Sequence, residues 1–238
     1  MKTEEIICPK CGSRHIKKNG TTRQKKQRYR CQRCGKQFLF ALSYRNRAWM
    51  PHLRELIVPM SLNGSGIRDT SRVLRVSTNT VLKVLRLAAA QIKEPRVPPR
   101  IKALEMDEQW SFVQNKKQQQ WLWYGLNRRT GRIAAFVVGR RTDWSCRQLE
   151  RKLARCQVQC FFTDHWKSYR KTLDPQRHVT GKKGTQNIER CNLNFRTHIK
   201  RLQRRTICFS KSIEMHLNLI KIYIHHRNSN AKSRQHHF

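Results

Sequence analysis

Residues 181–212 read GKKGTQNIERCNLNFRTHIKRLQRRTICFSKS, and this stretch decides how the rest of the chain is interpreted. From Gln186 onward apolar residues recur at three- and four-residue steps, which predicts one face of an α-helix. Glu189 is the only carboxylate between Asp174 and Glu214, and it lies among many Lys and Arg residues. Arg196, seven residues further on, falls on the same side of the predicted helix. A surface ion pair is one interpretation, but a carboxylate that holds a divalent metal against a nucleic-acid phosphate better explains one acid among so many bases.

The composition favours a polyanionic partner. The 238 residues include 52 Lys plus Arg against 14 Asp plus Glu, a formal net charge of +38. Such a charge destabilises a compact state by self-repulsion unless a polyanion neutralises it, and nucleic-acid phosphate is the natural polyanion. An anionic membrane is the rival, but the sequence has no apolar run of about 18 residues and no signal peptide. We therefore expect an intracellular protein with no membrane partner, although basicity alone does not identify an enzyme.

The cysteines form two sets. Four of them form two CxxC pairs separated by nineteen residues, which is zinc-ribbon spacing. Four thiolates close a tetrahedral shell around Zn²⁺, so this zinc would be structural, and a redox CxxC would need no partner pair. We assign residues 1–47 to a zinc ribbon held by Cys8, Cys11, Cys31 and Cys34. The remaining five are expected to be small buried hydrophobes: Cys146, Cys156, Cys160, Cys191 and Cys208.

Residues 48–93 are predicted to form a helix-turn-helix DNA-binding domain. Helices are expected over residues 52–60, 67–74 and 78–90, with Leu56 and Val73 facing inward and Ser77 as the N-cap of the third helix. In this motif the last helix enters the DNA major groove. Its outward residues would contact bases or phosphates: Thr78, Asn79, Thr80, Lys83 and Arg86. A three-helix bundle that binds nothing is the alternative.

Residues 94–101 are predicted to form a linker, because Pro95, Pro98 and Pro99 cannot continue a helix. Residues 102–238 then form a second domain. Three strands over residues 103–115, 121–126 and 133–139, joined by short turns that include 116–120, predict an antiparallel meander.

Further elements follow in the second domain. A helix over 143–155 with Trp144 inward, a strand over 158–163 and a brief helix over 169–173 are expected. A strand over 178–180, the helix that carries Glu189 and a last helix over 210–227 complete the chain. The order βββ-α-β-α-β-α is that of a ribonuclease-H-like mixed sheet with flanking helices. We therefore expect an α/β fold (α+β in the multi-domain sense), with the zinc ribbon and helix-turn-helix in front of it.

This topology would gather three acids. Asp107 falls on the first strand, Asp164 ends the fourth, and Glu189 arrives on the adjacent helix. Three carboxylates would hold two Mg²⁺ or Mn²⁺ ions, which serve an in-line displacement at phosphorus. Glu105 is the plausible substitute for Asp107, whereas Glu108 is expected to face the opposite side of the strand.

Several motifs carry a resemblance to a known family. They are CPKCGS (8–13), CQRCGKQF (31–38), the segment from Leu62 to Leu85, MDEQWSFV (106–113), FTDHW (162–166) and the segment from Thr185 to His216. The chain resembles transposases of the first-numbered bacterial insertion-sequence family, the InsA–InsB type, over nearly its whole length. That family has a DDE triad with twenty-four residues between the second acid and the Glu, as between Asp164 and Glu189 here. The resemblance implies Asp107, Asp164 and Glu189 as the triad and Arg196 as its basic companion on phosphate.

The resemblance also implies a reaction and partners. The reaction would be metal-dependent cleavage at the 3′ ends of an insertion sequence, followed by strand transfer into target DNA. The partners would be double-stranded DNA, as terminal inverted repeats and target, and further copies of the chain in a homodimer or larger synaptic assembly. Such a protein would work in the prokaryotic cytoplasm at the nucleoid. The basic tract expected to grip flanking or target DNA consists of Lys200, Arg201, Arg204 and Arg205. The alternatives are a nuclease of the same fold without strand transfer, and a zinc-ribbon DNA-binding regulator without catalysis.

Overall fold

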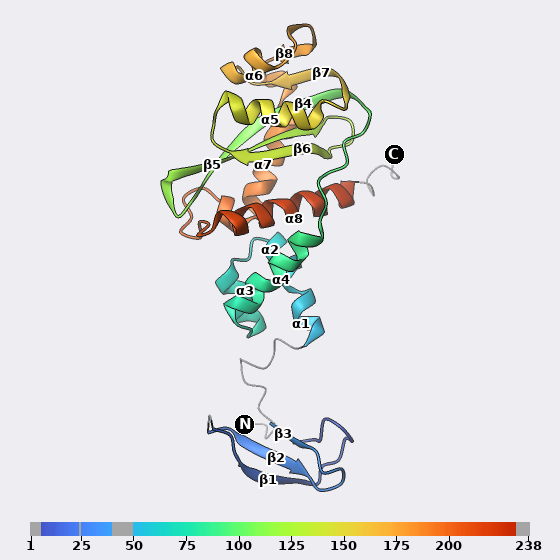
Figure 1. Cartoon of the computed structure of the whole chain (residues 1–238), viewed down its shortest axis with the longest axis vertical. Helices are drawn as coiled ribbons and strands as arrows, with labels where there is room; N and C mark the ends of the chain where they lie inside the picture. Colours follow the sequence, from blue (N-terminus) through green and yellow to red (C-terminus); the bar gives the residue numbers. More distant parts are fainter. Residues whose placement is uncertain (1–5, 24, 40–49, 232–238) are drawn as a thin grey trace.

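The computed structural model describes residues 6–23, 25–39 and 50–231 (Figure 1). The first unit is an antiparallel sheet of β1 (Ile16–Thr21), β2 (Gln27–Cys31) and β3 (Gln37–Leu39), in that spatial order. Apolar burial among its described residues is confined to Cys8 and Cys31. A unit with so small a core depends on a bound metal for its folding free energy. The predicted boundary at residue 47 lies outside the described residues.

The second unit is a group of four short helices. They are α1 (Pro51–Glu55), α2 (Ile57–Leu62), α3 (Ile67–Leu74) and α4 (Thr78–Gln91). The single helix predicted over 52–60 was wrong: it divides at Leu56 and continues to Leu62. Pro59 explains the break, because it has no N–H to donate to the carbonyl four residues earlier, that of Glu55.

The turn between α3 and α4 follows the prediction. Arg75 adopts a left-handed conformation with φ of 52° and ends α3, and the Ser77 hydroxyl accepts the backbone N–H of Thr80 at 3.1 Å. The inward placement of Leu56 and Val73 was wrong, since both side chains are exposed. The buried face of α3 instead consists of Thr70, Ser71 and Leu74. Val73 lies on the other side of the helix.

The third unit contains a five-stranded mixed sheet. Its strands are β4 (Arg100–Val113), β5 (Asn115–Asn127), β6 (Ile133–Gly139), β7 (Gln157–Thr163) and β8 (His178–Thr180), in the spatial order β6-β5-β4-β7-β8. The first three strands pair antiparallel, whereas β4–β7 and β7–β8 pair parallel. This is the predicted ribonuclease-H-like arrangement, and it puts β4 in the centre beside β7.

The hairpin between β4 and β5 is longer than predicted. The polar run over 116–120 was expected to be a turn, but it belongs to β5, and the chain reverses at Gln114, which has φ of 63°. Cross-strand pairing continues through Phe112 and Gln119. The two strands therefore extend as a ribbon beyond the part of the sheet that helices cover (Figure 1).

Helices cover both faces of the sheet. On one face α5 (Asp143–Leu153) and α6 (Lys167–Thr172) pack over Leu104, Met106 and Trp123. Trp144, predicted to face inward, is 64% exposed, because the buried face of α5 runs through Cys146, Leu149 and Leu153. On the other face lie α7 (Gln186–His198) and α8 (Ile213–Ala231).

The helical unit and the third unit share one hydrophobic core. Leu53, Ile57, Val81 and Leu85 of the helical unit belong to the same buried cluster as the apolar residues of α7 and α8. The long helix α8 lies between α4 and the sheet (Figure 1). The proline-containing segment between α4 and β4 thus joins two units that pack against each other.

Candidate active site

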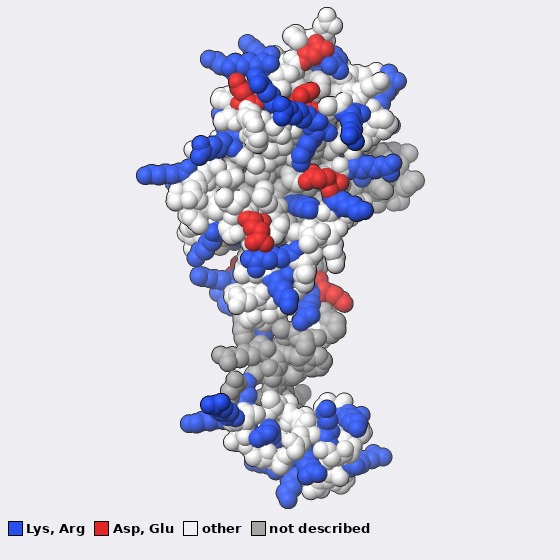
Figure 2. All heavy atoms as spheres, viewed as in Figure 1, with Lys and Arg blue, Asp and Glu red and all other residues white. Residues whose placement is uncertain are grey.

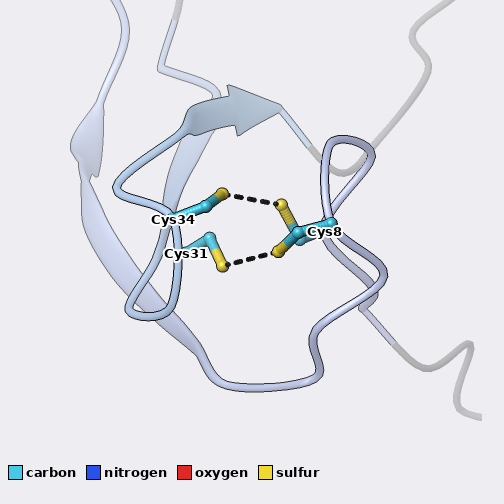
Figure 3. A group of neighbouring side chains, drawn as sticks. Cys8, Cys31 and Cys34 are labelled. Atoms are coloured by element: carbon cyan, nitrogen blue, oxygen red, sulfur yellow. Dashed lines mark hydrogen bonds between the residues drawn. The ribbon is translucent and has the colours of Figure 1, made fainter.

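The four cysteines predicted to hold zinc lie together in the ribbon (Figure 3). The Sγ atoms of Cys8 and Cys34 are 3.6 Å apart, as are those of Cys11 and Cys31, and all four lie within 4.8 Å of one another. A tetrahedral zinc with Zn–S bonds of about 2.3 Å sets neighbouring sulfurs about 3.8 Å apart. All four thiols are free of disulfides. The cluster therefore fits one zinc ion in a closed shell.

A second cluster consists of carboxylates at the centre of the large sheet. Glu105 of β4 is in register with Phe162 of β7, so Asp107 and Asp164, each two residues further on, are neighbours across the parallel pair. Carboxylate oxygens of Asp107, Glu108 and Asp164 lie within 4.8 Å of one another. Asp164 follows the end of β7, where its Oδ1 accepts the backbone N–H of Trp166 at 3.0 Å. Asp107 and Asp164 thus lie next to each other, as predicted.

Glu108 faces the opposite side of β4 as predicted, yet its carboxylate also belongs to this cluster, which the sequence did not predict. Its side chain does leave the opposite face of β4 from Asp107, and it is held there by Arg141 and Tyr169. Arg141 donates to Oε1 from Nε at 2.9 Å and from a terminal nitrogen at 2.6 Å, and the Tyr169 hydroxyl donates to Oε2 at 2.7 Å. The guanidinium also lies over the rings of Trp121 and Trp166, at 4.7 and 3.6 Å from their centroids.

Glu105, the predicted substitute, has a structural role. It is fully buried and accepts hydrogen bonds from the Asn187 side chain at 2.7 Å and from the backbone N–H of Ile188 at 2.8 Å. A carboxylate on the free N–H groups of a helix N-terminus is stabilising. Glu105 thus fixes the first turn of α7 against β4 and thereby positions the helix that carries Glu189.

A second contact joins α7 to the acids. The Asn192 amide donates to Asp107 Oδ2 at 2.6 Å, and the hydroxyl of Tyr124 donates to Asn192 Oδ1 at 2.8 Å. Tyr124 is fully buried, so this bond fixes which way the amide points. Asn192 lies three residues after Glu189, so helical periodicity places it near the same face of α7, and its side chain reaches the site.

Glu189 lies on the exposed side of α7, one turn before Asn192. Its carboxylate accepts a hydrogen bond from the Thr185 hydroxyl at 3.3 Å, and it is not part of the three-acid cluster. Arg196 is half-buried on the same helix. Burial lowers the pKa of the Arg196 guanidinium, as does Arg204, while the Asp107 carboxylate acts in the opposite sense. The role of Glu189 as third acid stays a prediction.

Negative charge is crowded at the acid cluster, where Arg141 is paired with Glu108. Burial, and next the neighbouring Glu108 carboxylate, raise the pKa of Asp107 to about 7. Burial likewise raises the pKa of Glu108, against the hydrogen bonds from Tyr169 and Arg141. Carboxylate oxygens crowded in this way are the ligands that hard divalent cations prefer, and a cation would remove the repulsion among them. The residues present fit a divalent metal.

The predicted DNA-contacting residues of α4 differ in how exposed their side chains are. Thr78, Asn79 and Lys83 are exposed, and Thr80 is half-buried, with its hydroxyl 2.9 Å from that of Ser77. Arg86 forms an ion pair with Glu214 of α8 at 3.0 Å. Three of the five side chains are therefore free to meet DNA, whereas Arg86 already has a carboxylate partner.

The basic tract after α7 is also divided. Arg204 and Arg205 are exposed, and Lys200 is half-buried in the short 3-10 helix η4 (Lys200–Leu202). Arg201 turns inward and donates to the Ser210 hydroxyl at 3.3 Å, and burial lowers the pKa of its guanidinium to about 10. Lys and Arg side chains are spread over the visible face of the molecule and outnumber the acidic side chains there (Figure 2).

Sequence reasoning missed four residues around the acids. Asn192, Tyr124, Arg141 and Tyr169 each bond directly to an acid or to a residue that does. Only Asn192 gave a signal, through its position on the helix face of Glu189. The other three come from separate elements whose side-chain meeting depends on tertiary packing.

Comparisons with known proteins place this chain in a family. Residues 100–230 match the family described as IS1 transposase, and residues 43–88 match the InsA C-terminal domain. The chain is 48% identical over 120 residues to the iso-IS1n protein InsB of Shigella dysenteriae, covering 50% of this chain and 92% of that protein. It is 42% identical over 120 residues to an IS1 protein InsB of Escherichia coli K12, covering 50% and 72%. These matches define the class of protein as a DDE-type transposase.

More particularly, the chain belongs to the IS1 transposase family. The resemblance inferred from the sequence motifs is confirmed, as is a DNA-binding helix-turn-helix. Membership also implies the use of a divalent metal. No helix among the described residues is long and apolar enough to cross a membrane.

Proposed function

We propose that this protein cleaves the 3′ ends of its insertion sequence and joins them to target DNA. The observation that carries the proposal is the placement of Asp107 beside Asp164 at the centre of a ribonuclease-H-like sheet, within a chain of strongly positive charge. A site of oxygen ligands next to a polyanion-binding surface suits displacement at a phosphodiester.

The chemistry consists of two displacements at phosphorus. In the first, water forms a bond to phosphorus and the P–O3′ bond breaks, which leaves a 3′-hydroxyl at the element end and a 5′-phosphate on the flank. In the second, that 3′-oxygen forms a bond to a target phosphorus, and the target P–O3′ bond breaks. The first step is a hydrolysis that consumes one phosphoester bond, and the second exchanges one phosphoester bond for another, so neither requires an oxidant or a high-energy cofactor.

Asp107, Asp164 and Glu189 would hold the divalent ions, two Mg²⁺ or Mn²⁺. When bound, such ions supply Lewis acidity at the phosphate and at the attacking oxygen. Asn192 orients the Asp107 carboxylate, and Glu105 fixes the helix that carries Glu189. Arg196, half-buried beside Asp107, would contact a phosphate oxygen and hold the scissile strand in place.

The other basic surfaces would hold the rest of the DNA. The zinc ribbon and α4, through Thr78, Asn79 and Lys83, would bind the terminal inverted repeats, and Arg204 and Arg205 would bind flanking or target DNA. Because two ends must be paired, at least two copies of the chain would act together. Such an assembly would work on chromosomal DNA at the nucleoid.

The test is a strand-joining assay with labelled element ends and supercoiled target in Mg²⁺. We expect wild-type protein to join the ends and Asp164→Ala to lose both cleavage and joining. The matched control is Asp174→Ala, which removes an acid paired with Arg177 on the surface of the same unit. Equal activity of Asp164→Ala and wild type would refute the assignment. Cleavage without joining by wild type would favour a nuclease of the same fold.

A further inference from the structure

Four aromatic side chains that are not part of the acid cluster form a strip on the large sheet. This aromatic strip consists of Trp121, Trp110, Phe112 and Phe209. Trp110 of β4 and Trp121 of β5 are directly paired across the hairpin, so both side chains project from the same face. The ring centroids of Trp110 and Phe112 are 5.4 Å apart, and those of Phe112 and Phe209 are 5.3 Å apart. The strip therefore continues from the sheet onto the segment before α8.

The strip begins at the acid cluster. Glu108, Trp110 and Phe112 alternate along β4 and so share one face. Two residues of a strand span about 7 Å, which puts Trp110 that far beyond Glu108. Arg141 ties the two features together, because it bonds Glu108 and lies over the Trp121 ring. Whatever stacks on Trp110 is thus within one nucleotide of the acids.

Trp121 packs against the core under α5, but the other three rings of the strip do not belong to a core. Trp123, next to Trp121 in β5, is fully buried under α5, and its indole N–H donates to the carbonyl of Arg140. Trp110 is 37% exposed, and Phe112 and Phe209 are half-buried. Neither of the two hydrophobic cores includes Trp110, Phe112 or Phe209. The strip lies on the part of the hairpin that α5 and α6 leave uncovered.

The positive charge around the aromatic strip favours a negatively charged ligand. No acid occurs between Glu108 and Asp143, nor between Glu189 and Glu214, so the hairpin and the neighbouring segment carry only positive charge. Lys116 and Lys117 are exposed at the start of β5, and the carbonyl of the exposed Lys211 accepts from the Gln114 side chain at the hairpin turn. A second copy of so basic a chain would be repelled from this face. A polyanion with flat apolar faces would be attracted.

We propose that the aromatic strip stacks unpaired bases of the DNA strand whose phosphodiester lies at the acid cluster. In a paired duplex the base faces are already stacked on one another, so only an unpaired base presents its face to an indole ring. Stacking of bases on aromatic side chains beside a basic groove is the general mode of single-strand binding. The inference rests on the proposed function for the choice of DNA strand, but its test requires no cleavage.

The experiment compares two oligonucleotides with the full chain, zinc-loaded and without added Mg²⁺. One is a blunt duplex of the element end, and the other is a fork with unpaired bases at the end, one of which is 2-aminopurine. Wild-type protein is expected to bind the fork more tightly and to quench 2-aminopurine emission by stacking. Trp110→Ala should weaken fork binding by roughly tenfold, restore the emission and leave blunt-duplex binding unchanged.

Two further variants separate stacking from folding. Trp110→Phe keeps an aromatic face and should retain the quenching, and Trp144→Ala, which removes an exposed tryptophan from α5, should bind both DNAs as wild type does. Equal loss on fork and blunt duplex, or no fork preference in wild type, would overturn the proposal. Loss of self-association in Trp110→Ala with unchanged fork binding would assign the strip to a second copy and would also overturn it. Because no strand is cut, failure of the cleavage assay leaves this result standing.

Discussion

The two candidate metal sites of this molecule are built in opposite ways. In the zinc ribbon, four thiols from two short turns meet around one point, and they close a shell that leaves no position for a substrate. At the centre of the large sheet, acids from β4 and the end of β7 meet and leave ligand positions open, and the pKa values of the two β4 acids, Asp107 and Glu108, are raised. With its metal bound, the first site would stabilise a fold, whereas the second imposes a cost on the fold that a bound cation and DNA would offset.

Removal of a ribbon ligand should have the largest effect. Cys31→Ala opens the closed shell, and structural zinc contributes on the order of 10 kcal/mol to folding in small zinc modules. We expect loss of the zinc, measured by metal analysis, and proteolysis within residues 6–39, while the thermal transition of the large sheet is retained. The matched control is Cys208→Ala, outside the cluster. Full zinc content in Cys31→Ala would contradict the closed-shell assignment.

Removal of an acid from the second site should change stability in the opposite direction. The pKa of Asp107 is about 7 in the fold against 3.8 as its ordinary value. The unfolded chain therefore loses its proton first, and the free energy of unfolding of metal-free protein falls as pH rises from about 4 to about 7. Asp107→Asn removes this penalty and should stabilise metal-free protein at pH 7.5 by roughly 2–4 kcal/mol.

Urea unfolding at pH 5 and pH 7.5 measures this difference. The matched control is Asp143→Asn, because hydrogen bonds from Ser168 and Lys171 lower the pKa of Asp143. That substitution should destabilise the protein at pH 7.5. If Asp107→Asn and Asp143→Asn changed the free energy of unfolding in the same direction, the proposed cost of ionising Asp107 in the folded protein would be disproved.

His216, a buried histidine of α8, also has a shifted pKa, and it provides a second prediction for the pH dependence of stability. On the face of β4 that carries Asp107, Arg201 donates to Ser210 (3.3 Å), Ser210 donates to His216 Nδ1 (2.7 Å), and His216 Nε2–H donates to Ser111 (3.0 Å). With a neutral imidazole, each group in this chain has a hydrogen-bond partner. Burial, and next Arg201, lower the pKa of His216 to about 4.

The lowered pKa of His216 makes the stability of the fold depend on pH. Between pH 6.5 and pH 4 the unfolded chain takes up a proton that folded His216 does not, so stability falls as pH falls and is unaffected above pH 6.5. His216→Gln should reduce the loss of stability between pH 7 and pH 4 by about 3 kcal/mol relative to wild type. His225→Gln, an exposed histidine on the same helix, is the control. An unchanged pH profile in His216→Gln would refute the neutral buried imidazole.

The ion pair between Arg86 and Glu214 should have the smallest effect. Both side chains are about half exposed, and exposed pairs contribute about 0–1 kcal/mol. Glu214→Gln should leave the thermal transition nearly unchanged. Because it frees Arg86 for phosphate, it should tighten duplex binding at low salt, whereas Arg86→Ala should not. A large loss of stability in Glu214→Gln would show that the α4–α8 contact depends on this pair.

The two sites also differ in how far sequence predicts them. The ribbon ligands are close in the chain, so CxxC spacing alone located all four. The meeting of Asp107 and Asp164 followed from strand order, because a parallel neighbour of the central strand must end beside it. Glu108 was missed because strict alternation along a strand places it on the far face, and only the positions of Arg141 and Tyr169 bring its carboxylate to the cluster.

The remaining errors share one cause. The polar run over 116–120 resembles a turn, yet it extends β5 past the covered sheet, where no apolar alternation is required. Leu56, Val73 and Trp144 are apolar but exposed. Their placement depends on which faces of α1–α5 pack against other units, such as the core shared with α8. Periodicity within one segment contains no information about such partners.

The acids of the large sheet are tested most directly by a Mn²⁺ titration followed by electron paramagnetic resonance, on protein whose ribbon is already loaded with zinc. We predict that wild type and Asp174→Asn bind Mn²⁺ equally and that Asp164→Asn loses this binding. Equal Mn²⁺ binding by Asp164→Asn and wild type would contradict the assignment of Asp107 and Asp164 as the metal-holding pair.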